Sequence, residues 1–333
     1  MMHILLYHNA VIPPPKYGGT ERVIYYLAKA LALLGNRVSL IAREGSVVPG
    51  VEVIPLPKNN APDWQTLIPK STDILHLWST PGNLPRIPFL VTIEGNGQVR
   101  ERFHPNTVFV SAKHAANHGS ENFVHNGIDP EDFQWDEKKD DYFVFLAKAN
   151  WKVKNLKGAI ELSRAANIPL EVMGSREWPL QIHRLFPRWG GVHYRGMVGD
   201  IEKRQVLRKA KALLFPVLWH EPFGVAIIEA LASGCAVFGT PYGSLPEIIT
   251  PEVGKLSSSA DDLLMALSQF DYSPSACRKR VYEGFTHINM AEKYLTYYKR
   301  ILDKGTLQTN GKEVQALSSV PPETLLPWQT LKN

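Results

Sequence analysis

Short apolar runs alternate with amphipathic segments along most of this chain. The apolar run at residues 3–8 predicts a buried strand, and residues 20–34 have apolar positions at helical spacing. The same alternation predicts further strands at residues 37–42, 73–77, 89–93, 107–111, 142–146, 170–173, 192–194, 212–215, 236–238 and near Lys255. Strands that alternate with helices predict an α/β fold with parallel sheets and right-handed crossovers.

One polar stretch interrupts this alternation. Residues 129–141 are charged and show no apolar period, so we interpret them as a linker between two domains. The length of 333 residues is sufficient for two such domains. A late apolar period predicts a helix at residues 290–302, and the tail after Gly305 has little regular pattern.

The amino-acid composition indicates the broad class of protein and its cellular compartment. The hydrophobic content of 44% and the charged content of 21% are those of a globular protein. The two cysteines, Cys235 and Cys277, form neither a disulfide framework nor a zinc spacing, which fits a reducing compartment. The N-terminus lacks the features of a signal peptide, and no apolar stretch approaches the roughly 20 residues of a membrane span. We therefore expect a cytoplasmic protein.

The net charge of +5 is unevenly distributed. Residues 1–137 contain 11 Lys/Arg and 13 Asp/Glu, whereas residues 138–333 contain 26 and 19. A phosphate-rich small ligand in the second half would explain this difference. Nucleic acid is the alternative, but the chain has no basic stripe with interleaved aromatic residues and no known nucleic-acid module. We expect no nucleic-acid partner.

The loop and helix that follow the predicted strand at residues 212–215 carry the most specific chemistry. Glu221 and Glu229 lie on either side of a Pro-Phe-Gly turn and an apolar run. This pattern predicts a loop that holds Glu221 and a helix that begins near Phe223 or Gly224. Free N–H groups at the start of such a helix favour an anion. A ligand with both phosphate and hydroxyl groups, such as a sugar nucleotide, would fit.

Other loops after predicted strands could also contact a ligand. Lys148 and Lys154 follow one strand, where two amines could meet a diphosphate or lie in a solvated loop. Gly18 and Gly19 open the first predicted helix, as either a structural turn or a phosphate-binding turn.

Three further residues, Gly174, Met197 and Val198, also follow predicted strands. They could frame a nucleotide or form ordinary βα turns. Glu94 is a carboxylate in a glycine-containing loop, which packing alone does not readily explain. No metal site is expected, because the eleven histidines are scattered and no Asp-x-Asp follows an apolar strand.

Several short motifs follow one another along the chain from the N-terminus to the C-terminus. They are Gly18-Gly19-Thr-Glu, Asp73-Ile-Leu-His76, Thr92-Ile-x-Gly95, Asn126-Gly127-Ile128-Asp129, Lys154-Asn155, Gly196-x-Val198, Glu221-Pro-Phe-Gly with Glu229, and Gly243-Ser-Leu-Pro-Glu247. As a set they resemble the retaining GT-B glycosyltransferases of family 4, and the resemblance covers nearly the whole chain. It implies an α/β GT-B fold, with two Rossmann-like domains whose parallel sheets face a central cleft.

The resemblance also implies which domain binds the acceptor and which binds the donor. Residues 1–137, with a crossing helix and tail at about 288–333, would form the acceptor-side domain. Residues 138–287 would bind a nucleotide-diphosphate sugar. The implied reaction is the retaining, metal-independent transfer of a hexose-type sugar to a carbohydrate or lipid-linked acceptor, in the synthesis of a cell-surface glycan or glycolipid. No cofactor is expected beside the donor substrate. Peripheral contact with the inner face of the membrane and the oligomeric state stay open.

Individual roles follow from the same resemblance. Glu229 would bind the ribose hydroxyls, and Glu221 would lie near the transferred sugar. Catalytic contributions would come from Glu221, Lys154, Lys148 and Glu94, with the two lysines on the diphosphate. The implied nucleotide-sugar contacts also include Gly18, Gly19, Gly174, Met197, Val198, Phe223, Gly224 and Val225.

Two positions depart from the family pattern. Lys148 stands where the family usually has Arg, and Lys cannot supply the bidentate fork of a guanidinium. Glu94 stands where the family commonly has His near the reacting centre. This carboxylate could bind an acceptor hydroxyl or amine, stabilise positive charge on the sugar, or reduce transfer. A GT-B protein that binds without transferring sugar, and a GT-B phosphorylase, are therefore the alternatives.

Overall fold

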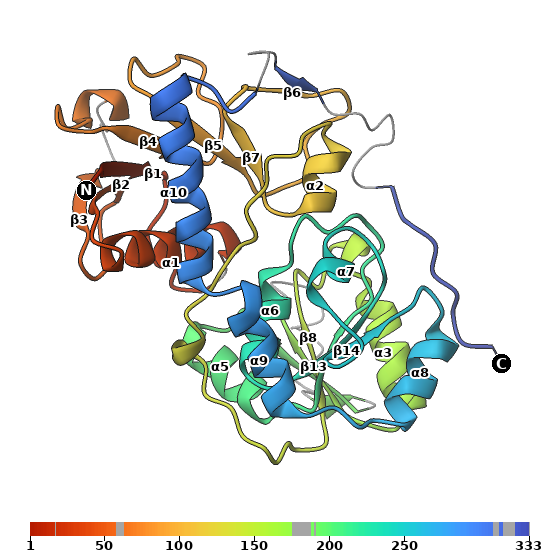
Figure 1. Ribbon diagram of the computed structural model, residues 1–333. Helices are drawn as coiled ribbons and strands as arrows, with labels where there is room; N and C mark the ends of the chain where they lie inside the picture. Colours follow the sequence, from red (N-terminus) through yellow and green to blue (C-terminus); the bar gives the residue numbers. More distant parts are fainter. Residues whose placement is uncertain are drawn as a thin grey trace. The chain divides into compact units, whose positions relative to one another are not determined.

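The computed structural model describes residues 1–16, 18–57, 63–174, 188–189, 191–308, 313–315 and 324–332. The chain divides into two compact units (Figure 1). Unit 1 comprises residues 1–129 and 285–321, and unit 2 comprises residues 130–284 and 322–333.

This division differs from the sequence-based boundaries at two places. The chain first passes from unit 1 to unit 2 after residue 129, whereas the sequence suggested residue 137. The reason is that the charged stretch packs on unit 2. Its Phe133 is buried, and Asp136 receives hydrogen bonds from Arg208 at 2.8 and 3.0 Å. The end of the tail, residues 322–333, also belongs to unit 2 and not to unit 1.

Unit 1 is built on a sheet of six described strands in the order β3-β2-β1-β4-β5-β7, with every pairing parallel. The strands are β1 (His3–Tyr7), β2 (Arg37–Arg43), β3 (Glu52–Leu56), β4 (Ile74–Leu77), β5 (Phe89–Ile93) and β7 (Thr107–Phe109). The strand order reverses at β1 and β4, so the loops after these strands diverge, as at a ligand-binding switch point.

Strand β3 is the element of this sheet that the sequence pattern missed. It lies at the edge of the sheet, is only partly buried and contains Pro55. Proline is tolerated in an edge strand, but it obscures the strand signal in the sequence.

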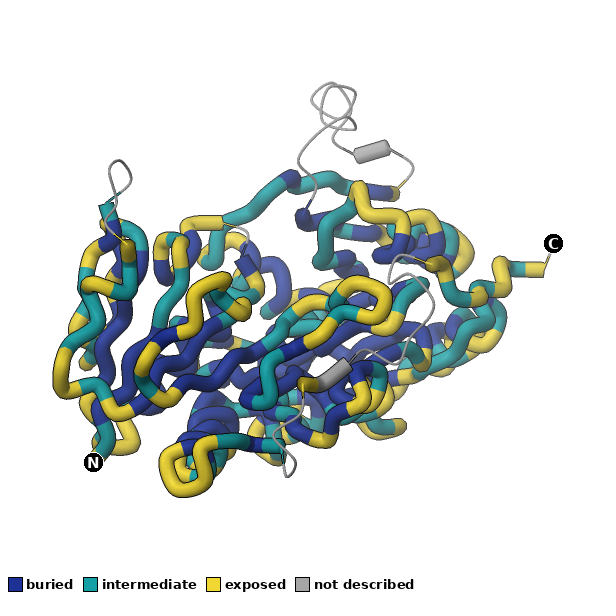
Figure 2. The backbone as a smooth tube through the Cα atoms, turned by 90° about the horizontal axis from the view of Figure 1, so that it is seen from above, coloured by how far each residue is buried: buried dark blue, intermediate teal, exposed yellow. Residues whose placement is uncertain are grey.

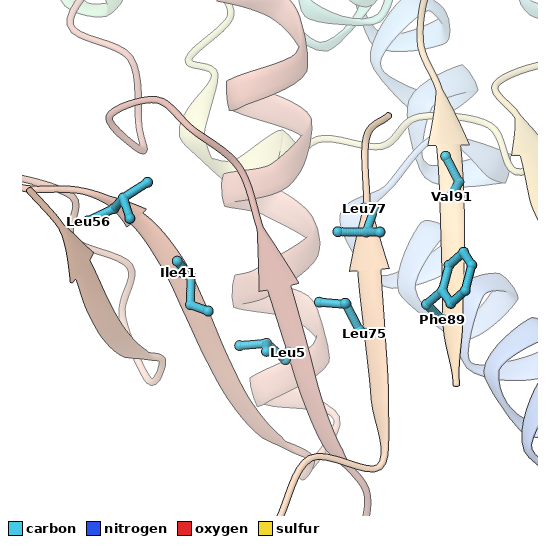
Figure 3. Packing of buried hydrophobic residues seen from close by; sticks show 7 residues of the cluster. All are labelled: Leu5, Ile41, Leu56, Leu75, Leu77, Phe89 and Val91. Carbon is cyan, nitrogen blue, oxygen red and sulfur yellow. The ribbon is translucent and has the colours of Figure 1, made fainter. Parts of the chain in front are cut away.

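One face of the unit 1 sheet carries a hydrophobic cluster (Figure 3). Its members alternate along neighbouring strands, as side chains on one face of a sheet must. They are Leu5, Ile41, Leu56, Leu75, Leu77, Phe89 and Val91. Partly buried residues of η1 (Trp64–Leu67) pack against this cluster.

Helices α1 (Gly19–Leu33) and α10 (His287–Lys304) pack against each other, and α10 also contacts β5. In Figure 1, α10 crosses α1 at a large angle. Unit 1 also contains α2 (Ala112–Asn117) and a short antiparallel pair of β6 (Arg102–Phe103) and β15 (Val314–Gln315). The predicted late helix is therefore present and belongs to unit 1.

Unit 2 is built on a second sheet, in which the described strands follow the order β10-β11-β9-β8-β12-β13-β14. All pairs are parallel except that of β10 with β11. The strands are β8 (Phe143–Leu146), β9 (Leu170–Met173), β10 (Arg188–Trp189), β11 (Val192–Gly196), β12 (Ala212–Phe215), β13 (Ala236–Gly239) and β14 (Gly254–Leu256). Here the order reverses between β8 and β12, which places a switch point between them.

Helices connect these strands in the α/β manner that the sequence predicts. They are η2 (Pro130–Asp132), η3 (Lys152–Lys154), α3 (Leu156–Ala165), α5 (Asp200–Lys209), α6 (Val225–Ala232), α7 (Leu245–Ile248), α8 (Ala260–Ser268) and α9 (Pro274–Gly284). Figure 2 shows buried residues concentrated along the strands of both units. The predicted α/β fold with two Rossmann-like units is confirmed.

Candidate active site

The switch point of unit 2 brings together two loops that the sequence singled out. One follows β8 and contains Lys148 and Lys154, and the other follows β12 and contains Glu221. Asn155 connects them: its side-chain amide donates to the Pro216 carbonyl at 3.0 Å. The Asn155 oxygen also accepts from the Gly158 N–H at 3.0 Å, which caps α3.

Lys154 and Glu221 form a direct ion pair within this site. The Lys154 Nζ atom lies 2.6 Å from Glu221 Oε2, and both side chains are about nine-tenths buried. The Trp219 indole N–H donates to the same oxygen at 2.6 Å, and the Lys154 ammonium lies 4.7 Å from the Trp219 ring centre. The sequence pointed to Lys154 and Glu221 but not to their pairing, nor to Trp219. A buried ammonium with one carboxylate partner retains donors for a ligand phosphate.

Helix α6 begins beside Glu221 with an uncapped end. Gly224 precedes the helix at φ 88°, a backbone conformation that side chains strongly disfavour, and as a glycine it has no side chain to cap this end of the helix. The first turn also contains no acidic residue. The sequence predicted an anion site at this helix start, and a free N–H at the start of a helix, such as that of Val225, favours an anion. Phe223 has a different part: its ring is buried, and its carbonyl accepts from Ser244 Oγ at 2.6 Å.

Glu229 lies on α6 and is also paired. Its Oε1 atom lies 2.5 Å from Lys203 Nζ, and both side chains are almost fully buried. Lys203 also contacts Asp200 at 3.1 Å. The sequence did not single out Lys203, because a lysine on a highly charged helix such as α5 normally faces solvent. The pair holds the Glu229 carboxylate in one orientation.

The remaining predicted donor-side residues surround these two pairs. Lys148 is half-buried, with its ammonium 4.1 Å from the Trp151 ring centre. Gly174 follows β9 at φ 107°, and a Cβ atom there would lie 2.1 Å from the Ala147 carbonyl oxygen. This glycine therefore permits a close backbone contact next to Lys148. Met197 and Val198 are half-buried after β11, where α5 begins two residues later.

Unit 1 holds the other predicted residues, at the carboxyl ends of its own strands. Gly18 and Gly19 begin α1 after the loop that follows β1. A Cβ atom at Gly18 would lie 2.6 Å from Glu21 Oε2, so the Glu21 carboxylate folds over the start of α1. Glu21 also lies 3.5 Å from His8 Nε2. An acidic side chain occupies this helix start, which disfavours a second anion there.

Glu94 lies at the end of β5 in a buried polar environment. Its Oε2 atom accepts from the Asn126 side-chain N–H at 2.8 Å. Within the described part of the chain, Glu94 Oε1, Asn126 Oδ1 and Trp78 Nε1 are buried and make no hydrogen bond of normal geometry. Burial raises the pKa of the Glu94 carboxyl to about 7. Asn126 and Trp78 oppose this rise, and the Glu21 carboxylate adds to it.

This environment predicts a pH-dependent stability. Because the pKa of Glu94 is about 7 in the folded chain and 4.5 ordinarily, stability falls as pH rises from about 4.5 to about 7 and changes little above that. We expect Glu94→Gln, which mimics the protonated form, to have nearly the stability of the native chain at about pH 4, below both pKa values. At pH 8 the variant should be more stable, by up to about 3 kcal/mol. Urea unfolding at both pH values measures this, with exposed Glu121→Gln as the control. Equal stability of the native chain and Glu94→Gln at pH 8 would refute the assigned environment.

His76, which the sequence placed at a strand end, is a core residue. Its ring nitrogens contact the Tyr298 hydroxyl at 2.6 Å and the Thr92 hydroxyl at 2.8 Å, and Tyr294 also contacts Thr92 at 2.9 Å. Burial lowers the pKa of His76 to about 3, so the ring is neutral. This network fixes α10 against β4 and β5 and places Trp78, which stacks on His76.

No group of three or more His, Cys, Asp or Glu side chains among the described residues is arranged to hold a metal ion. None of the helices described for this chain is both long and apolar enough to cross a membrane.

Comparisons with known proteins bear on this site. Residues 128–270, which cover the two ion pairs and most of unit 2, match the family described as "Glycosyl transferases group 1". An uncharacterized glycosyltransferase of Methanocaldococcus jannaschii is 26% identical over 211 residues. That match covers 53% of this chain and 53% of the relative, so the chain spans about half the length of the curated protein it matches. In sequence, unit 2 is therefore similar to group 1 glycosyl transferases.

Solved structures show the same fold over nearly the whole chain. AviGT4, a glycosyltransferase involved in avilamycin A biosynthesis, is 23% identical with a TM-score of 0.78, covering 92% of this chain and 100% of that chain. The Anabaena protein HepE in complex with UDP-glucose is 12% identical with a TM-score of 0.64, covering 90% and 100%. Because these sequence identities are low, the structural likeness establishes the fold alone, which is GT-B.

Proposed function

We propose that this chain is a retaining glycosyltransferase of family 4 that takes a hexose-type sugar from a nucleotide-diphosphate donor. The observation that carries the proposal is the buried Lys154–Glu221 pair beside the uncapped start of α6. Both lie at the switch point of a sheet whose sequence matches group 1 glycosyltransferases. The HepE complex contains UDP-glucose, a donor of the proposed class.

The donor diphosphate is assigned to the positive end of this site. As the bond between sugar and phosphate breaks, negative charge grows on the leaving diphosphate. Lys154, Lys148 and the Val225 N–H would meet that charge without a metal ion. Preorganised donors of this kind stabilise a transition state by about 3 kcal/mol each.

The two carboxylates are assigned to different groups of the donor. Glu221, held by Lys154 and the Trp219 indole, is assigned to the transferred sugar. Glu229, held by Lys203, is assigned to the ribose hydroxyls, which would donate to its carboxylate. Gly174, Met197 and Val198 then border the base and ribose from the ends of β9 and β11.

The acceptor is assigned to unit 1, at Glu94. The Glu94 carboxyl and the neighbouring Trp78 N–H are assigned as one acceptor and one donor, which together suit a hydroxyl group. A carbohydrate or lipid-linked carbohydrate supplies such hydroxyls. A cytoplasmic location, in glycan or glycolipid synthesis, agrees with the two free, buried cysteines.

One observation favours a second candidate function. Glu94 carries a carboxylate among buried groups, and Glu21 already fills the start of α1. A site with this negative charge would suit a protein that binds a sugar nucleotide without transferring the sugar.

A thermal-shift screen over UDP-, GDP- and ADP-sugars tests the proposal. We expect one donor class to raise the melting temperature of the native chain, and the nucleoside diphosphate alone to do so less. Release of nucleoside diphosphate on adding mono- and oligosaccharide acceptors then distinguishes transfer from binding alone. A protein that none of these donors stabilises would not be the proposed transferase.

A further inference from the structure

The C-terminal segment, residues 324–332, docks along unit 2 through backbone hydrogen bonds. The Ala260 N–H donates to the Gln329 carbonyl at 2.8 Å, and the Gln329 N–H donates to the Ser258 carbonyl at 2.8 Å. The Leu331 N–H donates to Glu161 Oε1 at 2.8 Å. Figure 1 shows this segment passing α8 before the C-terminus. The segment is thus attached to the loop between β14 and α8, to the start of α8 and to α3.

The same segment also reaches the two loops that follow β12 and β13. The Leu326 N–H donates to the Leu218 carbonyl at 2.7 Å, and Leu218 in turn donates to the Val153 carbonyl at 2.7 Å. The Tyr242 hydroxyl donates to the Pro327 carbonyl at 2.6 Å. One end of this chain of contacts is therefore next to Lys154.

Glu221 lies on the loop that follows β12, and its backbone contacts the loop that follows β13. The Ser244 N–H donates to the Glu221 carbonyl at 3.0 Å. Gly243, at φ 66°, lies so close that a Cβ atom there would be 2.2 Å from the Glu221 carbonyl oxygen. A shift of the Tyr242 loop would therefore move the backbone of Glu221, and a shift of Leu218 would act on it through Trp219.

We propose that residues 324–332 form a strap that positions the donor site of unit 2. It rests on the proposed function of that site. By bonding Leu218 and Tyr242 at once, the strap holds the loop of Glu221 in place before a ligand arrives. A loop that is ordered in advance binds more tightly, because binding no longer has to order it.

Two single substitutions in the full chain remove one strap bond each. Tyr242→Phe deletes the hydroxyl that donates to Pro327, and Leu326→Pro deletes the N–H that donates to Leu218. Each should raise the Kd of the tightest binder among UDP, ADP and GDP by about three- to ten-fold, the loss of one hydrogen bond. Calorimetry measures this, with Leu325→Ala, at a half-exposed neighbouring residue, as the control.

Hydrogen exchange of the backbone amides at residues 217–224 is the second readout. The strap predicts faster exchange there in both variants and native exchange in Leu325→Ala, whether or not the native chain binds a nucleotide. If the native chain binds none of the three nucleotides, the proposed function fails while exchange still tests the strap. If melting temperatures fall but exchange at 217–224 and affinity stay native, the tail is merely structural and the proposal is overturned.

Discussion

Lys154→Met is expected to reduce kcat by at least about a hundredfold, because it removes the ammonium assigned to the leaving diphosphate. The same change leaves the Glu221 carboxylate buried without its cation, 2.6 Å from where Nζ was. Breaking a buried pair from one side costs about 3–5 kcal/mol of folding stability. The variant should therefore be both slow and less stable, as steady-state kinetics and urea unfolding measure.

A double variant separates these two effects. Lys154→Met with Glu221→Gln replaces the charged pair by a neutral one, so most of the lost stability should return. Activity should not return, because neither the cation nor the carboxylate is restored. If the double variant regains a rate close to that of the native chain, Lys154 and Glu221 have no part in the reaction.

Glu229→Gln is expected to weaken the binding of the preferred nucleoside diphosphate by about ten- to a hundredfold. The reason is that hydrogen bonds to a charged carboxylate contribute about 1.5–3 kcal/mol, and the amide is a weaker acceptor for the ribose hydroxyls. The Lys203 ammonium, 2.5 Å from Glu229 in the native chain, would also lose its main partner. Calorimetry with the diphosphate found in the donor screen measures the affinity.

The matched control for this prediction is Glu202→Gln. Glu202 lies on α5 next to Lys203 but is exposed, so its loss should leave nucleotide affinity unchanged. Native affinity in Glu229→Gln would show that the ribose is held elsewhere.

The chemistry-bearing loops of unit 2 could be predicted from sequence, but their pairing could not. The strand and helix signals around Glu221 are local, which is why the loop and the start of α6 were expected. The partners are remote: Lys154 is 67 residues from Glu221, and Lys203 is 26 residues from Glu229. A periodic pattern carries no information on such distances. Trp219 is close to Glu221 in the chain, but an indole beside a carboxylate has no sequence signal of its own.

The environment of Glu94 and the path of the tail were also beyond sequence reasoning. Glu94 owes its raised pKa to burial and to Glu21, which lies on another element. The tail docks mainly through backbone groups such as the N–H of Leu326 and the carbonyl of Pro327, and side-chain patterns do not report those. The hydrophobic alternation therefore predicted the two α/β units, but not that the C-terminal segment, residues 324–332, packs on unit 2.

A crystal structure of the native chain with the donor from the thermal-shift screen tests the central claim most directly. We predict that the donor lies at the ends of β8 and β12, with a diphosphate oxygen within hydrogen-bond distance of Lys154 Nζ and of the N–H groups at Val225. The ribose hydroxyls should contact Glu229. A donor bound away from Lys154, Val225 and Glu229 would contradict the proposed donor site.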